Sequence, residues 1–546
     1  MELTRFAASV GLIASFAGAG TALAGGRVIA YTGMDAPGQP PGTVVNGLGS
    51  LADHVRGPVI NSSGEILLFA ELSEPGLSTG LRSSVLRHDG DLLSLIAAED
   101  QQAPDLPGSS STFVVISPRI VLDDAGRGCF FATVDVAGDT YREGLWATDA
   151  LGDLRLVVRE GQTLPQSDPV SPVFGWQFSD LTDGSWFFGG GRAGFWATAT
   201  DPAAPSSTVD GLWSERPSVW PRELRVVARG GADTDFGGVN PSGVNGRGET
   251  IFRANVPDGA SVWSEAGGVL TQVAQAGSGA GGDVTFTSFG EPDMNDVGNS
   301  AWRASFSDHP SGAASGIWKQ MPLTAGVVAV EGMVAPGLPD LNGDGVSDYV
   351  FGLFGNVCAL ISRDGPVAFL ASAHTLDFSD QLQGVWTDRN GGLDLLENVA
   401  LVGDRPPGLP PSAEFVSFDR ESVVINANGD IAFKAQWQSP DASQAWGIWA
   451  EQGRKLTLVA KAVFSGADTG DIVVLPDGTQ FETRFVYFAG ATGNEDGRPS
   501  GFSDNGDLVY RAAESSGDSA ILVVDLGLFV DGFESGGTAA WSGVVP

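Results

Sequence analysis

The sequence gathers candidate metal ligands most densely between residues 340 and 348. Asp340, Asn342, Asp344 and Asp348 place side-chain oxygens at the first, third, fifth and ninth positions of this run, and the backbone carbonyl of Val346 falls at the seventh. Ca²⁺ is a hard cation that takes about six to eight oxygen ligands, and loops of this spacing supply them around a glycine turn. We therefore predict a Ca²⁺ site on this loop.

The run departs from an EF-hand in two respects. Its twelfth position is Phe351, where an EF-hand has a bidentate glutamate. Its flanks have the composition of loop and strand, and not of helices. The run is similar to the D-x-D-x-D-G loops of exported proteins, and an Asp-rich turn that binds no ion firmly is the alternative.

The other residues with catalytic potential form no recognisable site in the sequence. The histidines have no metal-ligand spacing, and we expect each on the surface or in a loop: His54, His88, His309 and His374. No nucleophile elbow, H-E-x-x-H motif or phosphate loop occurs, and the glycine run 189–191 precedes a strand and predicts a turn. With 66 acidic residues, no pair of carboxylates stands out as catalytic.

Overall charge excludes some classes of partner. The formal net charge is −36, which disfavours nucleic acid and anionic lipid, because both are bound through Lys and Arg. After the N-terminus no stretch has about 18 consecutive apolar residues, so we expect no transmembrane helix. We expect a soluble monomer with an acidic surface.

The chain is organised by a short turn that recurs eight times. Its fullest copy is Asn426-Ala-Asn-Gly429-Asp-Ile-Ala-Phe433. Asn caps its own type I turn, Gly accepts the positive φ that follows, and the apolar run predicts a strand. We call each copy a corner. The other corners begin at Asn61, Asp123, Gly191, Asn245, Asn295, Ser362 and Ser503, and the copy at Gly191 is degenerate.

Further strands recur after each corner. A Gly-x-Trp strand follows at Gly144-Leu-Trp146, Gly211-Leu-Trp213, Gly316-Ile-Trp318, Gly384-Val-Trp386 and Gly447-Ile-Trp449. Another apolar strand and a Pro/Gly loop come next. Four short strands repeated eight times predict one all-β domain, a β-propeller of about eight four-stranded blades. The recurring Trp could stack on sugars, but core packing explains its regular position better.

The two ends of the repeat array complement each other. Residues 27–31 have the pattern of an outer strand without its earlier partners, and residues 520–524 end a repeat that lacks such a strand. We predict that these segments pair and close the ring. Ala22-Leu23-Ala24 is a candidate cleavage site, so residues 1–24 are expected to be a secretory signal, 25–527 the propeller and 528–546 a C-terminal tail.

The corner and the Gly-x-Trp strand resemble the tandem N-x-x-G-x-x-A-F repeat family of exported bacterial proteins. Asn426 to Phe433 fits in full, Asn245 to Phe252 and Asn295 to Trp302 fit closely, and the remaining copies depart at the first or last place. The resemblance implies export and surface attachment, and the family has no established molecular function. Residues 528–541 resemble a D-G-F-E terminal segment of exported gammaproteobacterial proteins, which implies a sorting tail. A last strand with a frayed end is the alternative.

The two cysteines are not expected to pair. Cys129 belongs to the second repeat and Cys358 to the sixth, so they face each other across the ring of an eight-bladed propeller. A disulfide requires Cα atoms within about 7 Å. Both lie in apolar runs, where a free Cys behaves as a small buried hydrophobe.

Two functions fit these observations. The first is an exported, noncatalytic repeat protein that acts outside the cell or at its surface as a binding or scaffold module for an unknown protein or polysaccharide. The alternative is a secreted carbohydrate-active hydrolase or lyase that uses carboxylates at the channel mouth. Saturable binding without turnover would favour the first.

Overall fold

The computed structural model describes residues 26–526, apart from 50–56, 76–79, 107–110, 137–140, 165–174, 217–223, 231–235, 282–283, 310–311, 322–323, 355–358, 390–395, 441, 490–497 and 499. The predicted signal (1–24), the tail (528–546) and Cys358 lie outside the described residues. Nearly all the regular structure in the described part is β-strand, and the 3-10 turn η1 (Ala266–Gly268) is a short exception. No described helix has the length and apolar character that a bilayer crossing needs.

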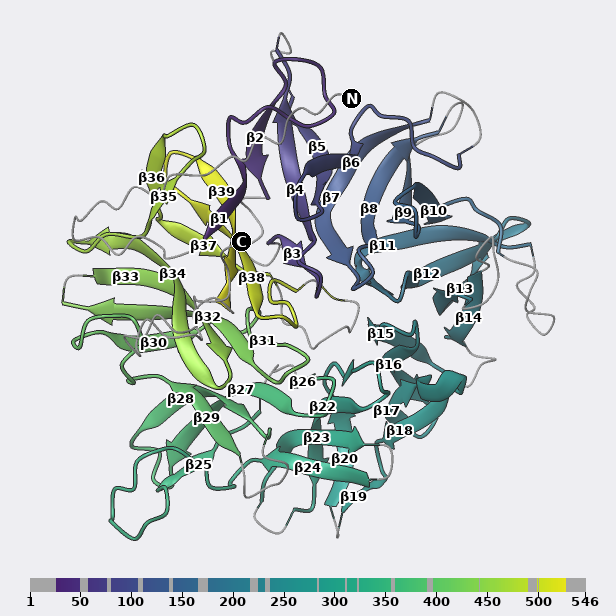
Figure 1. Ribbon diagram of the computed structural model, residues 1–546. Helices are drawn as coiled ribbons and strands as arrows, with labels where there is room; N and C mark the ends of the chain where they lie inside the picture. The colour runs from purple at the N-terminus through teal and green to yellow at the C-terminus, as the bar shows by residue number, and fades with distance from the viewer. Residues whose placement is uncertain are drawn as a thin grey trace, which may run out of the picture.

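The strands form eight antiparallel sheets arranged as a ring, so the chain is a β-propeller (Figure 1). Blade 1 consists of β2 (Val44–Leu48), β3 (Val59–Ile60), β4 (Ile66–Ser73), β5 (Arg82–His88) and β6 (Leu93–Ala98), and blade 2 of β7 (Thr112–Leu122), β8 (Gly128–Asp135), β9 (Tyr141–Thr148) and β10 (Leu154–Arg159). Blade 3 consists of β11 (Gln177–Gly189), β12 (Arg192–Asp201), β13 (Ala204–Glu215) and β14 (Leu224–Arg229). Blade 4 consists of β15 (Gly238–Val244), β16 (Thr250–Val256), β17 (Gly259–Ser264) and β18 (Thr271–Gln275).

Blades 5 to 8 continue around the ring. Blade 5 consists of β19 (Gly279–Gly281), β20 (Val284–Phe289), β21 (Asp293–Met294), β22 (Ser300–Ser307), β23 (Ser315–Met321) and β24 (Thr324–Val330), and blade 6 of β25 (Tyr349–Phe351), β26 (Leu360–Ile361), β27 (Val367–Thr375), β28 (Gln381–Thr387) and β29 (Glu397–Leu401). Blade 7 consists of β30 (Glu414–Phe418), β31 (Val424–Ile425), β32 (Ile431–Ser439), β33 (Ala442–Gln452) and β34 (Lys455–Gly466). Blade 8 consists of β37 (Phe485–Tyr487), β38 (Asp507–Ala513), β39 (Ser519–Asp525) and β1 (Arg27–Tyr31). An extra hairpin, β35 (Ile472–Val474) and β36 (Gln480–Glu482), lies between blades 7 and 8 in the sequence.

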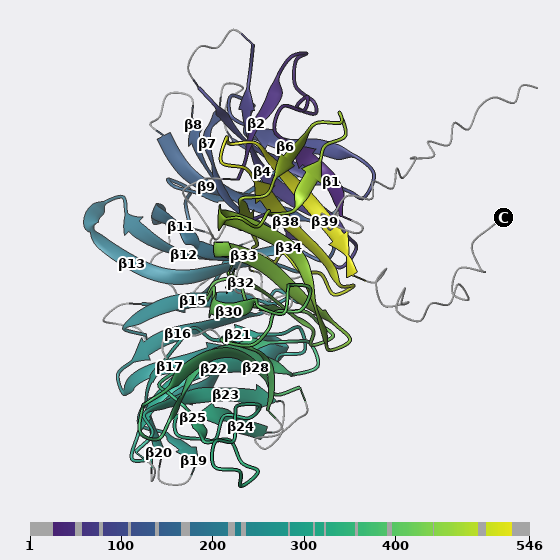
Figure 2. The same ribbon diagram turned by 90° about the vertical axis from the view of Figure 1, so that its left-hand side faces the viewer.

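The ring closes where the sequence predicted it. Strand β1 pairs antiparallel with β39, with Arg27 opposite Val523 and Tyr31 opposite Ala520, and so supplies the fourth strand of blade 8 (Figure 2). Because β1 and β39 pair with each other, both terminal repeats belong to one complete four-stranded blade, and two sheet edges that would otherwise be exposed are covered.

The hydrophobic core is divided among the blade boundaries. Each of the eight buried clusters combines residues of two neighbouring blades; one joins Val121 and Leu145 of blade 2 to Phe195 and Trp213 of blade 3. The first strand of most blades is interrupted near its middle: in blade 8 residues 488–501 separate β37 from the corner.

The recurring Trp is a core residue. In six blades it meets a Phe edge-on, with centroids 4.8–5.2 Å apart, as in the pairs Phe351–Trp386 and Phe415–Trp449. The Phe belongs to the first strand, except in blade 4, where it lies two residues before that strand. The Gly two places before it is required by space, since a Cβ on Gly384 would lie 2.7 Å from the Trp386 ring. The Gly-x-Trp motif is therefore explained by packing, because the indole of the Trp lies over the Gly two residues earlier in the same strand.

Buried ion pairs also join the blades. The carboxylate of Glu451 in blade 7 is 2.8 Å from Arg389 of blade 6, and that of Glu215 in blade 3 is 2.5 Å from Arg155 of blade 2. Both carboxylates also accept a backbone N–H at the start of a second strand, so their oxygens are well satisfied.

Candidate functional site

The predicted Ca²⁺ loop is exposed and held by its own side chains. Asp340 accepts the N–H groups of Gly343 and Gly345 at 2.5 and 2.6 Å. These bonds, chiefly that from Gly345, lower the pKa of Asp340. Asp348 accepts from the Asn342 side chain at 2.8 Å. The loop thus points oxygens inward, as a Ca²⁺ loop requires, but the carboxylates of its three Asp do not all lie within 4.8 Å of one another.

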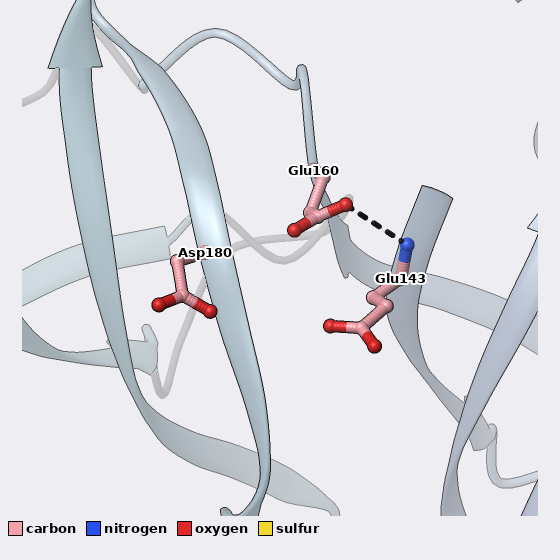
Figure 3. A group of neighbouring side chains, drawn as sticks. All are labelled: Glu143, Glu160 and Asp180. Carbon is pink, nitrogen blue, oxygen red and sulfur yellow. Dashed lines mark hydrogen bonds between the residues drawn. The ribbon is translucent and has the colours of Figure 1, made fainter. Parts of the chain in front are cut away.

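A tighter acidic group lies elsewhere and was missed from the sequence. The carboxylates of Glu143 in β9, Glu160 after β10 and Asp180 in β11 lie within 4.8 Å of one another at the boundary of blades 2 and 3 (Figure 3). Glu160 accepts the backbone N–H of Glu143 at 3.2 Å. Burial raises the pKa of both Glu143 and Glu160; the neighbouring carboxylates add to this for Glu143, whereas for Glu160 the Glu143 N–H group and Arg142 oppose it. Nothing in the spacing of residues 143, 160 and 180 indicated this contact.

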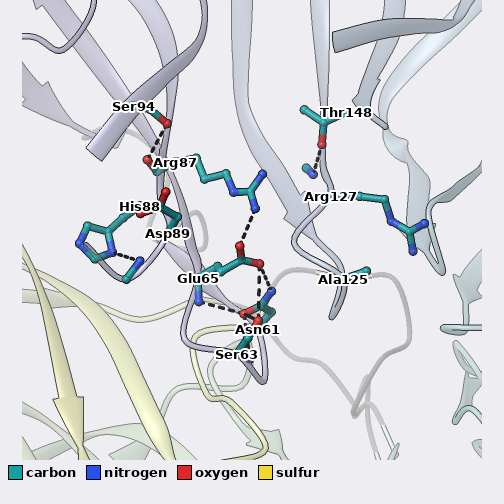
Figure 4. Close-up of polar contacts among 12 residues, drawn as sticks. Asn61, Ser63, Glu65, Arg87, His88, Asp89, Ser94, Ala125, Arg127 and Thr148 are labelled. Atoms are coloured by element: carbon teal, nitrogen blue, oxygen red, sulfur yellow. Dashed lines mark hydrogen bonds and ion pairs between the residues drawn. The ribbon is translucent and has the colours of Figure 1, made fainter. Parts of the chain in front are cut away.

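The first corner shows how the repeated turn is built (Figure 4). Asn61 is 3% exposed, and its Oδ1 accepts the N–H groups of Ser63 and Glu65 at 3.1 and 2.9 Å. Gly64 takes the fourth place at φ +80°. This is a type I turn followed by a left-handed residue, a common three-residue hairpin loop. The predicted self-capping by Asn is confirmed.

The same Asn also bonds to the next blade, which the sequence did not indicate. Nδ2 of Asn61 donates to the Asp123 carbonyl of the second corner at 3.2 Å. Three further corners repeat this bond at 2.6–3.2 Å, from Asn245 to Asn295, from Asn295 to Ser362 and from Asn426 to Ser503. The capping residue therefore ties its own turn and the neighbouring turn together around the axis.

The third corner was placed wrongly from the sequence. Its turn is at Gly190–Gly191, between Gly189 and Arg192, and not at 191–194. One residue fewer converts the loop to a two-residue turn, in which both central residues have positive φ, here +56° and +71°. A Cβ on Gly190 would lie 2.0 Å from the Gly246 carbonyl of the next corner, so Gly is also required for space.

The corners converge on a pocket of about 190 Å³ at the axis of the ring. Its apolar part comes from residues one place before a corner: Ile60, Leu122, Phe188, Ile425 and Phe502. Its polar part comes from the corners and from residues beside them: Asn61, Ser62, Asp123, Asp124, Arg127, Asp296, Arg498, Ser500, Ser503 and Asp504. Residues 61 and 504 are far apart in sequence, so only ring closure brings them together.

The pocket carboxylates are fixed by the neighbouring corners. The second residue of a corner donates its backbone N–H to an Asp at the second place of the next one, from Ser62 to Asp124 at 3.1 Å, from Gly246 to Asp296 at 2.5 Å and from residue 427 to Asp504 at 2.7 Å. Burial, more than the nearby Asp124, raises the pKa of Asp504. The recurrence of Asp at this place was a visible signal in the sequence.

Two arginines complete the pocket lining. Arg127 forms an ion pair with Asp123 at 2.7 Å. Arg498 comes from the insertion of blade 8 and donates to the carbonyls of Ser242 and Pro292, at 2.5 and 3.1 Å, in blades 4 and 5. Arg498 therefore crosses the ring, and no motif in the sequence marks it. The pocket combines fixed acceptors, hydroxyl groups and guanidinium donors around an apolar wall.

The positions of the histidines and of Cys129 can be compared with those that the sequence predicted. His88 is buried, 4% exposed, so it is not the surface or loop residue that was predicted. His374 is partly exposed, but it lies on strand β27 and not in a loop. His309 is in a loop and packs against Phe306, and His54 lies outside the described residues. Cys129 is a buried free thiol, whereas its predicted lack of pairing with Cys358 stays a prediction.

Comparison with protein families places the chain. Residues 21–184 and 177–527 match the model of a family of unknown function, DUF7453. The chain belongs to this family. No curated protein matches it in sequence. No activity is assigned to this family, so the function of the chain has to be inferred from its pocket and its loops.

Solved structures with a related arrangement are distant. The β-propeller domain of the trilobed protease from Pyrococcus furiosus is 7% identical, with a TM-score of 0.34, over 74% of this chain and 97% of that one. The WD40 domain of SCAP from fission yeast is 10% identical, with a TM-score of 0.33, over 87% and 96%. The periplasmic gluconolactonase of Pseudomonas aeruginosa is 14% identical, with a TM-score of 0.25, over 70% and 92%.

Proposed function

We propose that the protein is a noncatalytic binding module whose axial pocket receives a terminal sugar unit of a polysaccharide. The observation that supports this most is the fixing of Asp124, Asp296 and Asp504 by backbone N–H groups of neighbouring corners. A carboxylate held in this way is a pre-oriented acceptor. Preorganisation reduces the entropy lost on binding.

The rest of the pocket suits the same ligand. A sugar unit presents hydroxyl groups that both donate and accept, and apolar C–H faces. Arg498 adds guanidinium donors to the acceptors. The Ser62 and Ser500 hydroxyls donate within the protein, so their oxygens add further acceptors, and Phe188 and Phe502 supply apolar wall. The volume of about 190 Å³ is below the range of drug-sized sites, which favours a single unit.

Titration of the purified protein against a panel of polysaccharides and their monosaccharides tests this proposal. We expect saturable binding without product release. Asp296→Ala should weaken it about tenfold or more, since an anchored acceptor is lost. Asp364→Ala is the matched control, because Asp364 is an exposed corner residue outside the pocket lining and carries the same charge. Equal weakening by both variants would contradict the pocket assignment.

The second candidate is a carbohydrate-active enzyme, and one observation favours it. Glu143 and Glu160 are close enough for acid–base work on a glycosidic bond, and burial raises the pKa of each, as a general acid requires. Chromatography of polysaccharide digests would reveal turnover. Turnover that Glu160→Gln abolishes and Glu414→Gln leaves intact would replace the binding module with this enzyme.

We also propose that Ca²⁺ binds the loop 340–348 through Asp340, Asn342, Asp344, Asp348 and the Val346 carbonyl. The inward carboxylates of Asp340 and Asp348 support it. At a hundredfold excess over Kd, Ca²⁺ would stabilise the fold by about 2.7 kcal/mol. Calorimetry of the protein and of Asp344→Ala in added Ca²⁺ is the test, and identical unfolding curves would refute the site.

Export and surface attachment complete the proposal. The candidate signal at 1–24, the acidic surface and the terminal segment 528–546 support it. Cell fractionation should recover a chain cleaved after Ala24 outside the cytoplasm. Removal of 528–546 should release it from the surface, and retention there would contradict a role of the tail in attachment.

A further inference from the structure

The hairpin that joins β27 to β28 in blade 6 carries two exposed apolar side chains at its tip. Leu376 is 79% exposed and Phe378 is 75% exposed. The antiparallel topology puts this tip on the face opposite the corners, because β27 leads away from its corner. It is therefore separate from the axial pocket.

The backbone at Phe378 is in a conformation that an aromatic residue rarely adopts. The N–H of Phe378 bonds to the Thr375 carbonyl at 2.9 Å, which is the pattern of the corners, and Phe378 has φ +57° where corners have Gly. Of the described non-glycine residues with positive φ, three are Asp, one is Arg and one is this Phe. Such outliers persist where their surroundings enforce them, and they concentrate at functional sites.

The ring is held in one orientation. His374 stacks on Phe378 with centroids 4.0 Å apart and an interplanar angle of 18°. One ring face is thus covered, and the high exposure of the side chain leaves the other face open. A fixed aromatic face with its quadrupole outward is a receptor for a cation.

The flanking carboxylates reinforce that preference. Asp377 accepts from Thr375 and Ser379 at 2.7 Å each, and these bonds lower its pKa to about 2. Asp380 accepts from the Tyr349 hydroxyl at 2.5 Å. Both carboxylates are therefore fixed in the tip, one residue before and two residues after Phe378.

We propose that the Leu376–Phe378 tip is a docking site for a partner protein segment that carries Arg or Lys between apolar residues. The open ring face takes the cationic group, Asp377 and Asp380 neutralise it, and Leu376 meets the apolar neighbour. A net charge of −36 disfavours a second copy of this chain or an anionic partner.

The experiment uses a fluorescein-labelled peptide of alternating arginine and leucine, with a glutamate–leucine peptide as control, in anisotropy titrations at 150 mM salt as roughly physiological ionic strength. Phe378→Leu keeps charge and apolar character but removes the ring face. It should weaken binding roughly two- to fivefold, the range of an exposed cation–π contact. Phe378→Tyr should bind as the wild type does.

Phe378→Gly separates docking from a structural role. Gly relieves the positive φ, so it should raise the unfolding temperature while it weakens peptide binding about tenfold. Leu151→Ala is the control, because Leu151 is 85% exposed in the turn between β9 and β10 of blade 2, where the positive φ falls on Gly152. It should change neither quantity.

Three outcomes would overturn the inference. Unchanged affinity in Phe378→Leu and Phe378→Gly would mean that the peptide follows the overall charge. A lower unfolding temperature in Phe378→Gly with unchanged affinity would make the ring structural. Loss of polysaccharide binding in Phe378→Leu with unchanged peptide binding would assign the tip to sugar. Asp296→Ala should leave peptide binding intact, so failure at the axial pocket is distinguishable.

Discussion

Replacement of the corner residue Asn426 by Ala should destabilise the ring more than its small change in volume suggests. Asn426 is 1% exposed, and its Oδ1 accepts the N–H groups of Asn428 and Asp430, each at 3.0 Å. Its Nδ2 donates to the Ser503 carbonyl of blade 8 at 3.2 Å. Ala leaves all three backbone groups without this partner, and the Ser503 carbonyl is in a buried place.

The expected cost follows from the number of bonds lost. Each hydrogen bond contributes about 1 kcal/mol net, so Ala should cost about 3 kcal/mol. Ser occupies this place in the last corner, where Ser503 Oγ accepts a single N–H at 2.9 Å. Asn426→Ser should therefore keep one bond of three and cost about 2 kcal/mol. The chain itself supplies the intermediate step of the series.

Thermal unfolding followed by circular dichroism measures the series. A cooperative unit of about 500 residues has an unfolding entropy of about 1 kcal/mol/K, so Ala should lower Tm by about 3 °C and Ser by about 2 °C. Asn46→Ala, at an exposed strand position, should leave Tm unchanged. If Asn426→Ala were as stable as the wild type, or more stable than Asn426→Ser, the link between corners would not stabilise the ring.

Three further predictions concern other parts of the fold. Burial raises the pKa of Asp471 to about 6, so ionisation of this carboxyl should lower the stability of the fold as the pH rises from about 4 to 6. Asp471→Asn should therefore raise the free energy of unfolding by on the order of 2 kcal/mol at pH 7 and leave it unchanged at pH 4. An equal gain at both pH values in thermal unfolding would contradict this. Gly384→Ala should destabilise by about 1–3 kcal/mol, because its Cβ would overlap the Trp386 ring, whereas Gly326→Ala, with nothing within 4 Å, should be neutral in the same urea titration. Cys129, whose pKa is raised well above its usual range by burial, should react with a thiol reagent only after denaturation, and fast labelling of the native protein would refute its burial.

The sequence by itself determined the local structure of each blade. Asn or its substitutes at the first corner place and Gly at the fourth encode a turn through bonds within five residues, as in Asn61 to Glu65. The alternation of apolar residues and the Gly-x-Trp pattern encode which side chains are buried. Counting these units predicted eight blades, and the unmatched segments at 27–31 and 520–524 predicted the closing pair.

The tertiary structure decided everything that depends on which blades are neighbours. The bonds from Asn61 to the Asp123 carbonyl and from Arg498 to the Ser242 carbonyl join residues 62 and 256 positions apart, so no local pattern records them. The shortened third corner was misplaced because the Gly run fits two alignments, and only the approach of the Gly246 carbonyl selects one.

The same distinction applies to the candidate sites. The loop 340–348 was visible because its ligands are consecutive, whereas the axial pocket and the contact of Glu143 with Glu160 and Asp180 arise from separate strands. The strained Phe378 was hidden because a turn sequence does not reveal a positive φ at a residue other than Gly. Local hydrogen bonds and the burial of side chains follow from residues that are close together in the sequence. The contacts between side chains at the axis, in contrast, depend on closure of the whole ring.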